Sequence, residues 1–243
     1  MKRHGLFSGI ALGVVSCIAL SAPANAQTQL ITNGDFETGD FTGWNALTQA
    51  GSNGSLTVQS GTTGPNSGLP NVGPAGGTYF ALTDQGGPGA YSLSQAITVA
   101  AGATSVILSW DQFADDWDGS PTTGPIDYTG APVEFATADL LTGTADPFST
   151  APADVLANFY AGADSPLDSA DPYVHYSEDI TSLVSAGGTF IVRFGEADNQ
   201  GNFNLGVDNV SVEETVAPEP ATFLLIAPAF GALLAWKRKQ TKA

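Results

Sequence analysis

The chain has 243 residues, of which 24 are acidic and 7 are basic, giving a formal net charge of −17 at pH 7. Six of the basic residues lie in the two terminal segments, so residues 27–217 hold 23 acidic residues against Arg193 alone, a net charge of −22. This imbalance excludes nucleic acid and anionic membrane surfaces as partners of that region, because both require a positively charged face.

Residues 1–26 have the three parts of a secretory signal peptide. A basic pair opens the chain, an apolar run follows over residues 5–20, and Ala24-Asn25-Ala26 forms a small-x-small cleavage site before Gln27. Retention of this segment as a membrane anchor is disfavoured because the apolar run is short. Lipidation at Cys17 is disfavoured because the apolar run continues past this residue and a better cleavage site lies downstream. Cys17 is the only cysteine, so the processed chain has no disulfide or thiolate ligand.

Residues 27–217 are expected to form one all-β domain. Helix signals are confined to residues 153–159 and to one turn near residues 180–184. Alternation of apolar and polar residues at period two, as in Val106, Leu108 and Trp110, indicates strands with one buried face. The spacing of short β-prone runs between Gly, Pro, Asn and Ser clusters is typical of a sandwich or barrel. These runs are residues 55–59, 78–82, 91–99, 105–111, 190–194 and 206–212.

Two segments resemble the first and last strands of galactose-binding-like jelly rolls, a superfamily that includes many carbohydrate-binding modules. The first covers residues 30–39, LITNGDFETG, with Trp44 shortly after, and the second covers residues 206–212, GVDNVSV. The resemblance implies a jelly-roll β-sandwich. Phe36 and Trp44 are expected to pack in its core rather than to contact a ligand.

The same resemblance implies a structural calcium ion that ties the first strand to the last. The matching residues are Glu37 and Asp208, with Asp35 as a third ligand. A bound divalent cation would relieve part of the repulsion among the acidic residues, and calcium takes six to eight oxygen ligands. The alternative is that Glu37 and Asp208 face solvent or accept backbone hydrogen bonds.

A cluster of acidic residues with a tryptophan is expected where the run 105–111 ends. As a calcium loop it supplies oxygen ligands, although it departs from the EF-hand order. As a sugar site it supplies an apolar platform beside hydrogen-bond acceptors. A solvated acidic loop is the third interpretation, and the sequence leaves all three open. The cluster consists of Asp111, Asp115, Asp116, Trp117 and Asp118.

Signals for catalysis are weak. His175, the only histidine after the signal peptide, lies in the aromatic run 173–176, which predicts a packed or edge position. The sequence has no G-x-S-x-G, H-E-x-x-H or phosphate-binding glycine motif. We therefore predict no catalytic residues and no enzymatic activity. A second acidic stretch, residues 196–201, is expected to form the turn between the last two strands, and Arg193 to pair with a nearby acid.

The C-terminus reads as a motif, an apolar segment and a basic tail. Pro218-Glu219-Pro220 is followed by the apolar residues 222–236 and by a tail over 237–243 that opens with three basic residues. The apolar segment is short for a bilayer span, but its terminal position and the cationic tail favour a membrane segment with the tail on the cytoplasmic side. The order of the three parts resembles the PEP-CTERM sorting signal of Gram-negative bacteria, which covers residues 218–243.

The resemblance implies processing by an exosortase near the motif, with transient membrane anchoring through the C-terminal segment alone. It further implies release to the cell surface or to an extracellular polysaccharide matrix. We therefore expect an exported protein whose ectodomain, residues 27–217, binds polysaccharide or resides in it. The alternative is a glycoside hydrolase that uses two carboxylates, since that chemistry needs only a pair of acids at a set separation.

Overall fold

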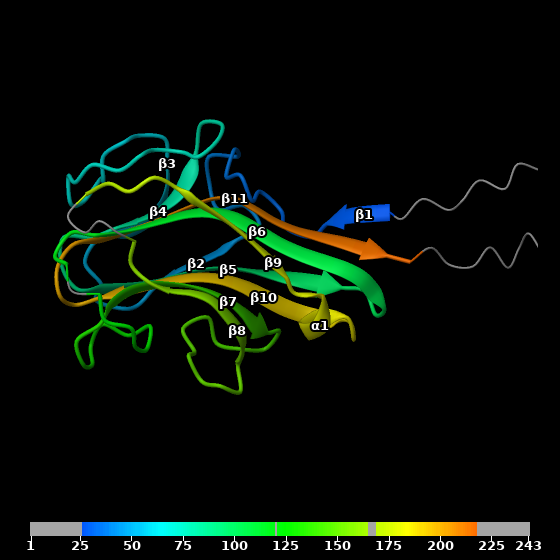
Figure 1. Cartoon of the computed structure of the whole chain (residues 1–243). Coiled ribbons are helices and arrows are strands. Elements are labelled where there is room, and N and C mark those ends of the chain that lie inside the picture. The colour runs from blue at the N-terminus through cyan, green and yellow to red at the C-terminus, as the bar shows by residue number, and fades with distance from the viewer. Residues whose placement is uncertain (1–25, 120, 165–168, 218–243) are drawn as a thin grey trace, which may run out of the picture.

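A computed structural model describes residues 26–119, 121–164 and 169–217. Within these ranges the chain forms eleven strands and one short helix, arranged as two antiparallel sheets packed face to face (Figure 1). The predicted signal peptide, apart from Ala26, and the predicted sorting signal lie outside the described residues. No helix among the residues that can be described is long and apolar enough to cross a membrane.

Sheet A contains five strands in one path and a sixth at its margin. Its order is β3 (Ser55–Gln59), β4 (Phe80–Asp84), β11 (Phe203–Val216), β6 (Ala103–Asp116) and β9 (Val174–Asp179), and β1 (Ala26–Gln29) pairs with β11. Sheet B has the order β2 (Asn45–Thr48), β5 (Gly89–Val99), β10 (Gly188–Asp198), β7 (Glu134–Thr142) and β8 (Val155–Gly162).

The path of the chain gives the sandwich its topology. From β4 to β7 and again from β8 to β11, successive strands lie in opposite sheets, which is the crossing pattern of a jelly roll. The expected all-β sandwich is therefore confirmed. Both described ends of the chain lie at the right of Figure 1, and the connection from β10 to β11 lies at the left.

The core lies between the two sheets. Inward residues of β6 and β10 meet there, and the ring of Trp110 lies 5.9 Å from that of Phe194. Phe36 is fully buried, and Trp44 packs on it at a ring distance of 5.5 Å. Both belong to the main hydrophobic cluster, so the prediction that they are core residues is confirmed.

All six predicted strands are present, most of them longer than expected. The run 105–111 is the middle of β6, which continues to Asp116, and the turn near residues 180–184 is α1 (Thr181–Val184). The predicted helix over 153–159 is wrong, because those residues enter β8 and pair with β7. Residues 30–39, which resemble the first strand of a jelly roll, form turns between β1 and β2 instead of a strand. Strands β1, β2 and β7 were not predicted. In β8, pairing with β7 outweighs the helical preference of Leu156 and Ala157.

Candidate functional site

Most of the predicted acidic cluster is not a loop, because β6 continues to Asp116 and turns successive side chains to opposite faces, while Trp117 and Asp118 follow in a bend. Asp111 lies on the outer face of sheet A. Its carboxylate contacts His175 Nδ1 at 2.7 Å and accepts a hydrogen bond from Asn209 Nδ2 at 2.7 Å. His175 lies on the edge strand β9 with 63% of its side chain exposed. The edge position predicted for this histidine is confirmed.

The other members of the cluster separate as well. Asp115 is buried and accepts a hydrogen bond from the Asp171 backbone at 3.0 Å, and burial raises its pKa to about 8. Asp116 points into the sandwich. Trp117 is half-buried and donates its indole N–H to Asn204 at 3.1 Å. The structure does not bring the five residues together at one site.

Glu37 and Asp208 meet the same segment, residues 75–79. Asp208 Oδ2 accepts the backbone N–H groups of residues 75 and 76 at 2.9 and 3.1 Å. Glu37 Oε1 accepts those of residues 78 and 79 at 2.6 and 2.8 Å, and these bonds lower the pKa of Glu37. Asp35 accepts the backbone N–H of Glu37 at 3.4 Å. Glu37 and Asp208 thus accept backbone hydrogen bonds, which was the alternative to calcium. No three His, Cys, Asp or Glu side chains gather as a metal centre in the described part of the chain, so calcium at this position stays a prediction.

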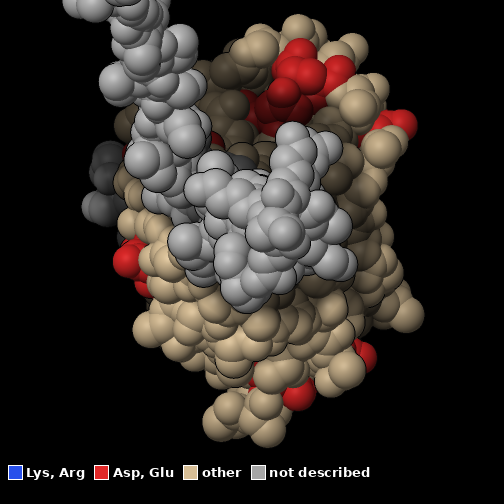
Figure 2. Space-filling view, turned by 90° about the vertical axis from the view of Figure 1, so that its right-hand side faces the viewer, with Lys and Arg blue, Asp and Glu red and all other residues tan. Residues whose placement is uncertain are grey.

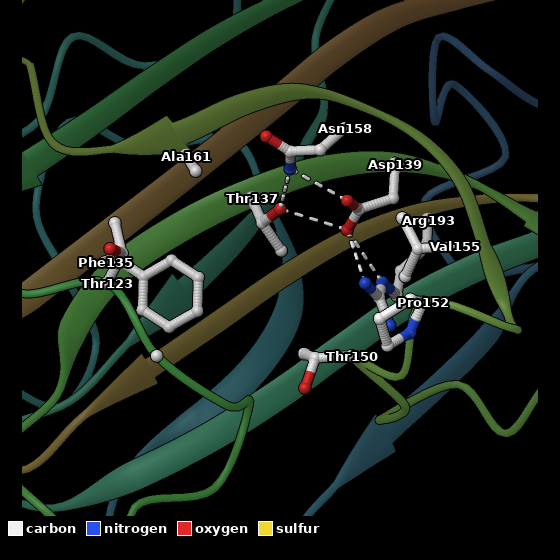
Figure 3. Close-up of a pocket in the computed structure, with 11 residues that line it drawn as sticks. Thr123, Phe135, Thr137, Asp139, Thr150, Pro152, Val155, Asn158, Ala161 and Arg193 are labelled. Carbon is white, nitrogen blue, oxygen red and sulfur yellow. Dashed lines mark hydrogen bonds and ion pairs between the residues drawn. The ribbon is translucent and has the colours of Figure 1, made fainter.

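A large hollow in the described surface lies on the outer face of sheet B. It has a volume of about 470 Å³, within the range of small-molecule sites. Its floor is formed by β7, β8 and β10, and its walls by the connections before β7 and after it (Figure 3). The residues that line it include Phe135, Thr137, Asp139, Thr150, Asn158 and Arg193.

An ion pair lies at the bottom of the hollow. Arg193 Nε donates to Asp139 Oδ2 at 3.0 Å, and both side chains are almost fully buried. Arg193 Nη1 donates to the carbonyls of Pro147 and Ser149 at 3.1 and 2.6 Å. The guanidinium therefore fastens the connection between β7 and β8 onto the sheet, and its charge is balanced by Asp139.

Asn158 and Thr137 complete the polar floor. Asn158 Nδ2 donates to Thr137 Oγ1 at 2.7 Å and to Asp139 Oδ1 at 2.8 Å. Figure 3 shows the amide oxygen of Asn158 turned away from Asp139. Apolar groups of Phe135, Val155 and Pro152 lie beside this network. The hollow thus combines a neutral hydrogen-bonding floor with apolar walls, a mixture that suits a ring bearing hydroxyl groups.

A second hollow adjoins the first. It has a volume of about 430 Å³ and is lined by residues 125–127, 146 and 148–149 with Gln49. Their lining residues are adjacent in sequence, because Gly124 and Thr150 line the first hollow while Pro125 and Ser149 line the second.

Sequence reasoning did not find these hollows. Their residues come from separate segments, and no motif links Asp139 to Arg193, 54 positions away. The expected pairing of Arg193 with a nearby acid is confirmed, and the acid is Asp139 on the neighbouring strand. Alternation turns Glu196 and Asp198 to the inner face of β10 while Arg193 faces outward. The turn lies between β10 and β11 as expected, but it is shorter than predicted because residues 196–198 belong to β10.

Comparison with solved structures gives distant likenesses. TmCBM61, solved with β-1,4-galactotriose, aligns with a TM-score of 0.48 and 10% identity over 76% of this chain and 97% of its own. The CBM22-1 xylan-binding domain of Paenibacillus barcinonensis Xyn10C aligns with a TM-score of 0.43 and 13% identity over 82% of this chain and 100% of its own. The K1 cleaved adhesin domain of Lys-gingipain from Porphyromonas gingivalis W83 aligns with a TM-score of 0.44 and 11% identity over 81% of this chain and 100% of its own. No family model and no curated protein matches the chain.

Proposed function

We propose that this chain is an exported surface or matrix protein whose ectodomain binds a neutral polysaccharide in the adjoining hollows of sheet B. The observation that carries the proposal is the neutral, polar floor of the first hollow on a domain that is otherwise acidic. Polysaccharides present both apolar ring faces and hydroxyl groups, and the walls and floor match these two features. The net charge of residues 27–217 disfavours anionic polymers.

Binding is favoured over hydrolysis by the state of two of the carboxylates in the hollows, Asp139 and Asp127. Asp139 is engaged by Arg193, Thr137 and Asn158. Asp127 has its pKa lowered by hydrogen bonds from Gln49 and Thr129, whereas a general acid needs a raised pKa. Glycoside hydrolysis is the second candidate, and release of sugars that stops when one acid is replaced by its amide would favour it.

The binding proposal is tested by filling the hollow. Ala161 lines the first hollow on β8, and Leu156 is exposed on the same strand outside it. Ala161→Trp should weaken binding to a neutral glycan by more than about tenfold, about 1.4 kcal/mol, whereas Leu156→Trp should leave it unchanged. Glycan-array screening followed by titration measures both. Equal affinity of wild type and Ala161→Trp for every bound glycan would place the ligand elsewhere.

We further propose that export uses the signal peptide and that an exosortase processes the C-terminus near Pro218-Glu219-Pro220. The order of motif, apolar segment and basic tail supports this. The intact mass of surface material from the native host tests it. Mature protein that retains Trp236 and Lys237 would instead indicate a permanent single-pass anchor.

A further inference from the structure

The inner face of the sandwich changes from apolar to acidic at the end where β10 connects to β11. Along β10 the inward residues Val192 and Phe194 belong to the core, and the next two inward residues are Glu196 and Asp198. Along β7, Glu134 is the inward residue opposite Asp198 in the strand pairing. Sheet B therefore places three carboxylates between the sheets at this end.

Sheet A contributes a fourth carboxylate to this layer. Asp116 is the last residue of β6 and shares the inward face with Ala114 and Trp110. Its carboxyl group lies within hydrogen-bonding reach of Glu134, although both groups are acceptors when ionised. We call Asp116, Glu134, Glu196 and Asp198 the inner carboxylate layer, and none of them is more than 1% exposed.

The chain supplies no positive charge to this layer. Arg193 is the only lysine or arginine among the described residues, and it lies on the opposite face of β10, paired with Asp139. Buried carboxylates are strongly destabilising unless they are paired, protonated or bound to a metal. Burial and the neighbouring Asp116 raise the pKa of Glu134 to about 8, which reflects this missing counter-charge.

Several oxygens of the layer have no hydrogen-bond donor. Both carboxylate oxygens of Glu134 and Oε1 of Glu196 are buried without a donor, as is the side-chain oxygen of Gln85. Gln85 belongs to the same region, since its Nε2 donates to Asp198 Oδ2 at 2.8 Å. Other oxygens of the layer accept hydrogen bonds, Asp116 from the backbone of residues 118 and 119, Glu196 from Thr83, and Asp198 from the backbone of residues 200 and 201. The buried oxygens left without a donor offer the chemistry that a hard divalent cation satisfies.

We propose that the inner carboxylate layer binds a calcium ion that joins the two sheets at the loop end of the sandwich. Glu134 and Asp116 are the central pair, because they already touch and come from opposite sheets. Glu196 and Gln85 supply the remaining unsatisfied oxygens. This position is distinct from the one beside residues 75–79, where Glu37 and Asp208 lie.

Binding at this layer would accompany folding. No three of its side chains are already gathered as a metal centre within the described residues, and none is open to solvent. The side chains would therefore have to shift toward the ion as the sheets close over it, and the binding free energy would appear as stability of the folded state. It would fix the connections that follow β6 and β10, which cover this end.

The test is thermal unfolding of the exported protein in calcium and in chelator, at a pH above about 8 where protons compete least. Calcium at about a hundred times its dissociation constant should raise the midpoint by roughly 5–10 °C. Glu134→Gln and Glu196→Gln should each remove most of the rise. Glu134→Gln should also raise the midpoint in chelator, because it removes a buried charge that lacks a partner.

Glu37→Gln is the matched control, since it changes the same group at the other candidate position and should keep the rise. The proposal is overturned if wild type shows no rise, or if the rise survives in both Glu134→Gln and Glu196→Gln. A rise that is lost only in Glu37→Gln overturns it as well and assigns the ion to the segment at residues 75–79. Circular dichroism of each variant in calcium confirms that folded proteins are compared.

Discussion

At the scale of single residues, Arg193 is the side chain on which the outer face of sheet B most depends. Replacing it with glutamine would leave Asp139 buried without a counter-charge and would remove the donors to Pro147 and Ser149. Breaking a buried ion pair from one side costs about 3–5 kcal/mol. We expect a loss of that size in urea unfolding.

The matched control is the double variant Arg193→Met with Asp139→Leu, which removes both charges at once. Replacing a buried pair by apolar side chains is often close to neutral, so the double variant should recover much of the lost stability. A single Arg193→Gln variant as stable as wild type would show that water or a shift of the connection after β7 compensates fully.

At the scale of elements, the bulge in β11 fixes how the first segment of the domain meets the last strand. The register with β6 shifts between Asp208 and Ser211, and Asn209 lies at a φ of 51°. Gly34 approaches this bulge so closely that a Cβ would lie 1.9 Å from the carbonyl oxygen of Val210. Gly34→Ala should therefore destabilise the domain by about 2–4 kcal/mol.

Gly61→Ala provides the control, because nothing lies within 4 Å of a Cβ at that position and its φ is not positive. It should be neutral or slightly stabilising, since alanine restricts the unfolded chain. Denaturant midpoints of the two variants check the pair of expectations. Equal midpoints would mean that the segment before β2 moves away from β11 without loss of stability.

The elements also show what the sequence could and could not predict. Strands with one buried face, such as the middle of β6, were predictable because their residues alternate. Strand β7 was not, because residues 134–141 are buried on both faces and show no alternation. The hollow on sheet B depends on the pairing of Asp139 with Arg193 across two strands, and the inner carboxylate layer depends on which way each strand end faces. Neither is encoded in a local motif.

At the scale of the whole molecule, the charge distribution predicts greater stability in acid than in alkali. Figure 2 shows only acidic charged side chains among the described residues of the end where the chain ends lie. Buried groups such as Asp115 have a folded pKa of about 8, above the unfolded value of about 3.9. Their stabilising effect is complete below about pH 4 and is lost as the pH rises toward about 8.

Thermal unfolding in chelator across this range measures the effect. The midpoint should fall as the pH rises, and Asp115→Asn should flatten the fall because asparagine does not titrate. Exposed carboxylates with lowered pKa values, such as Glu37 and Asp40, act in the opposite direction but are screened by solvent. A midpoint that rises steadily with pH would show that these surface groups dominate instead.

The pairing of β1 with the end of β11 has a mechanical consequence. Ala26 lies opposite Val216, so tension between the two ends would open this short ladder from its margin, one bonded pair after another, at low force. Tension that enters at Val216 and is resisted at the far end of the domain would load β11 along its 14 residues, where its bonds to β6 share the force. A copy pulled at both chain ends would thus yield first by releasing β1, while the rest of the sandwich stays closed.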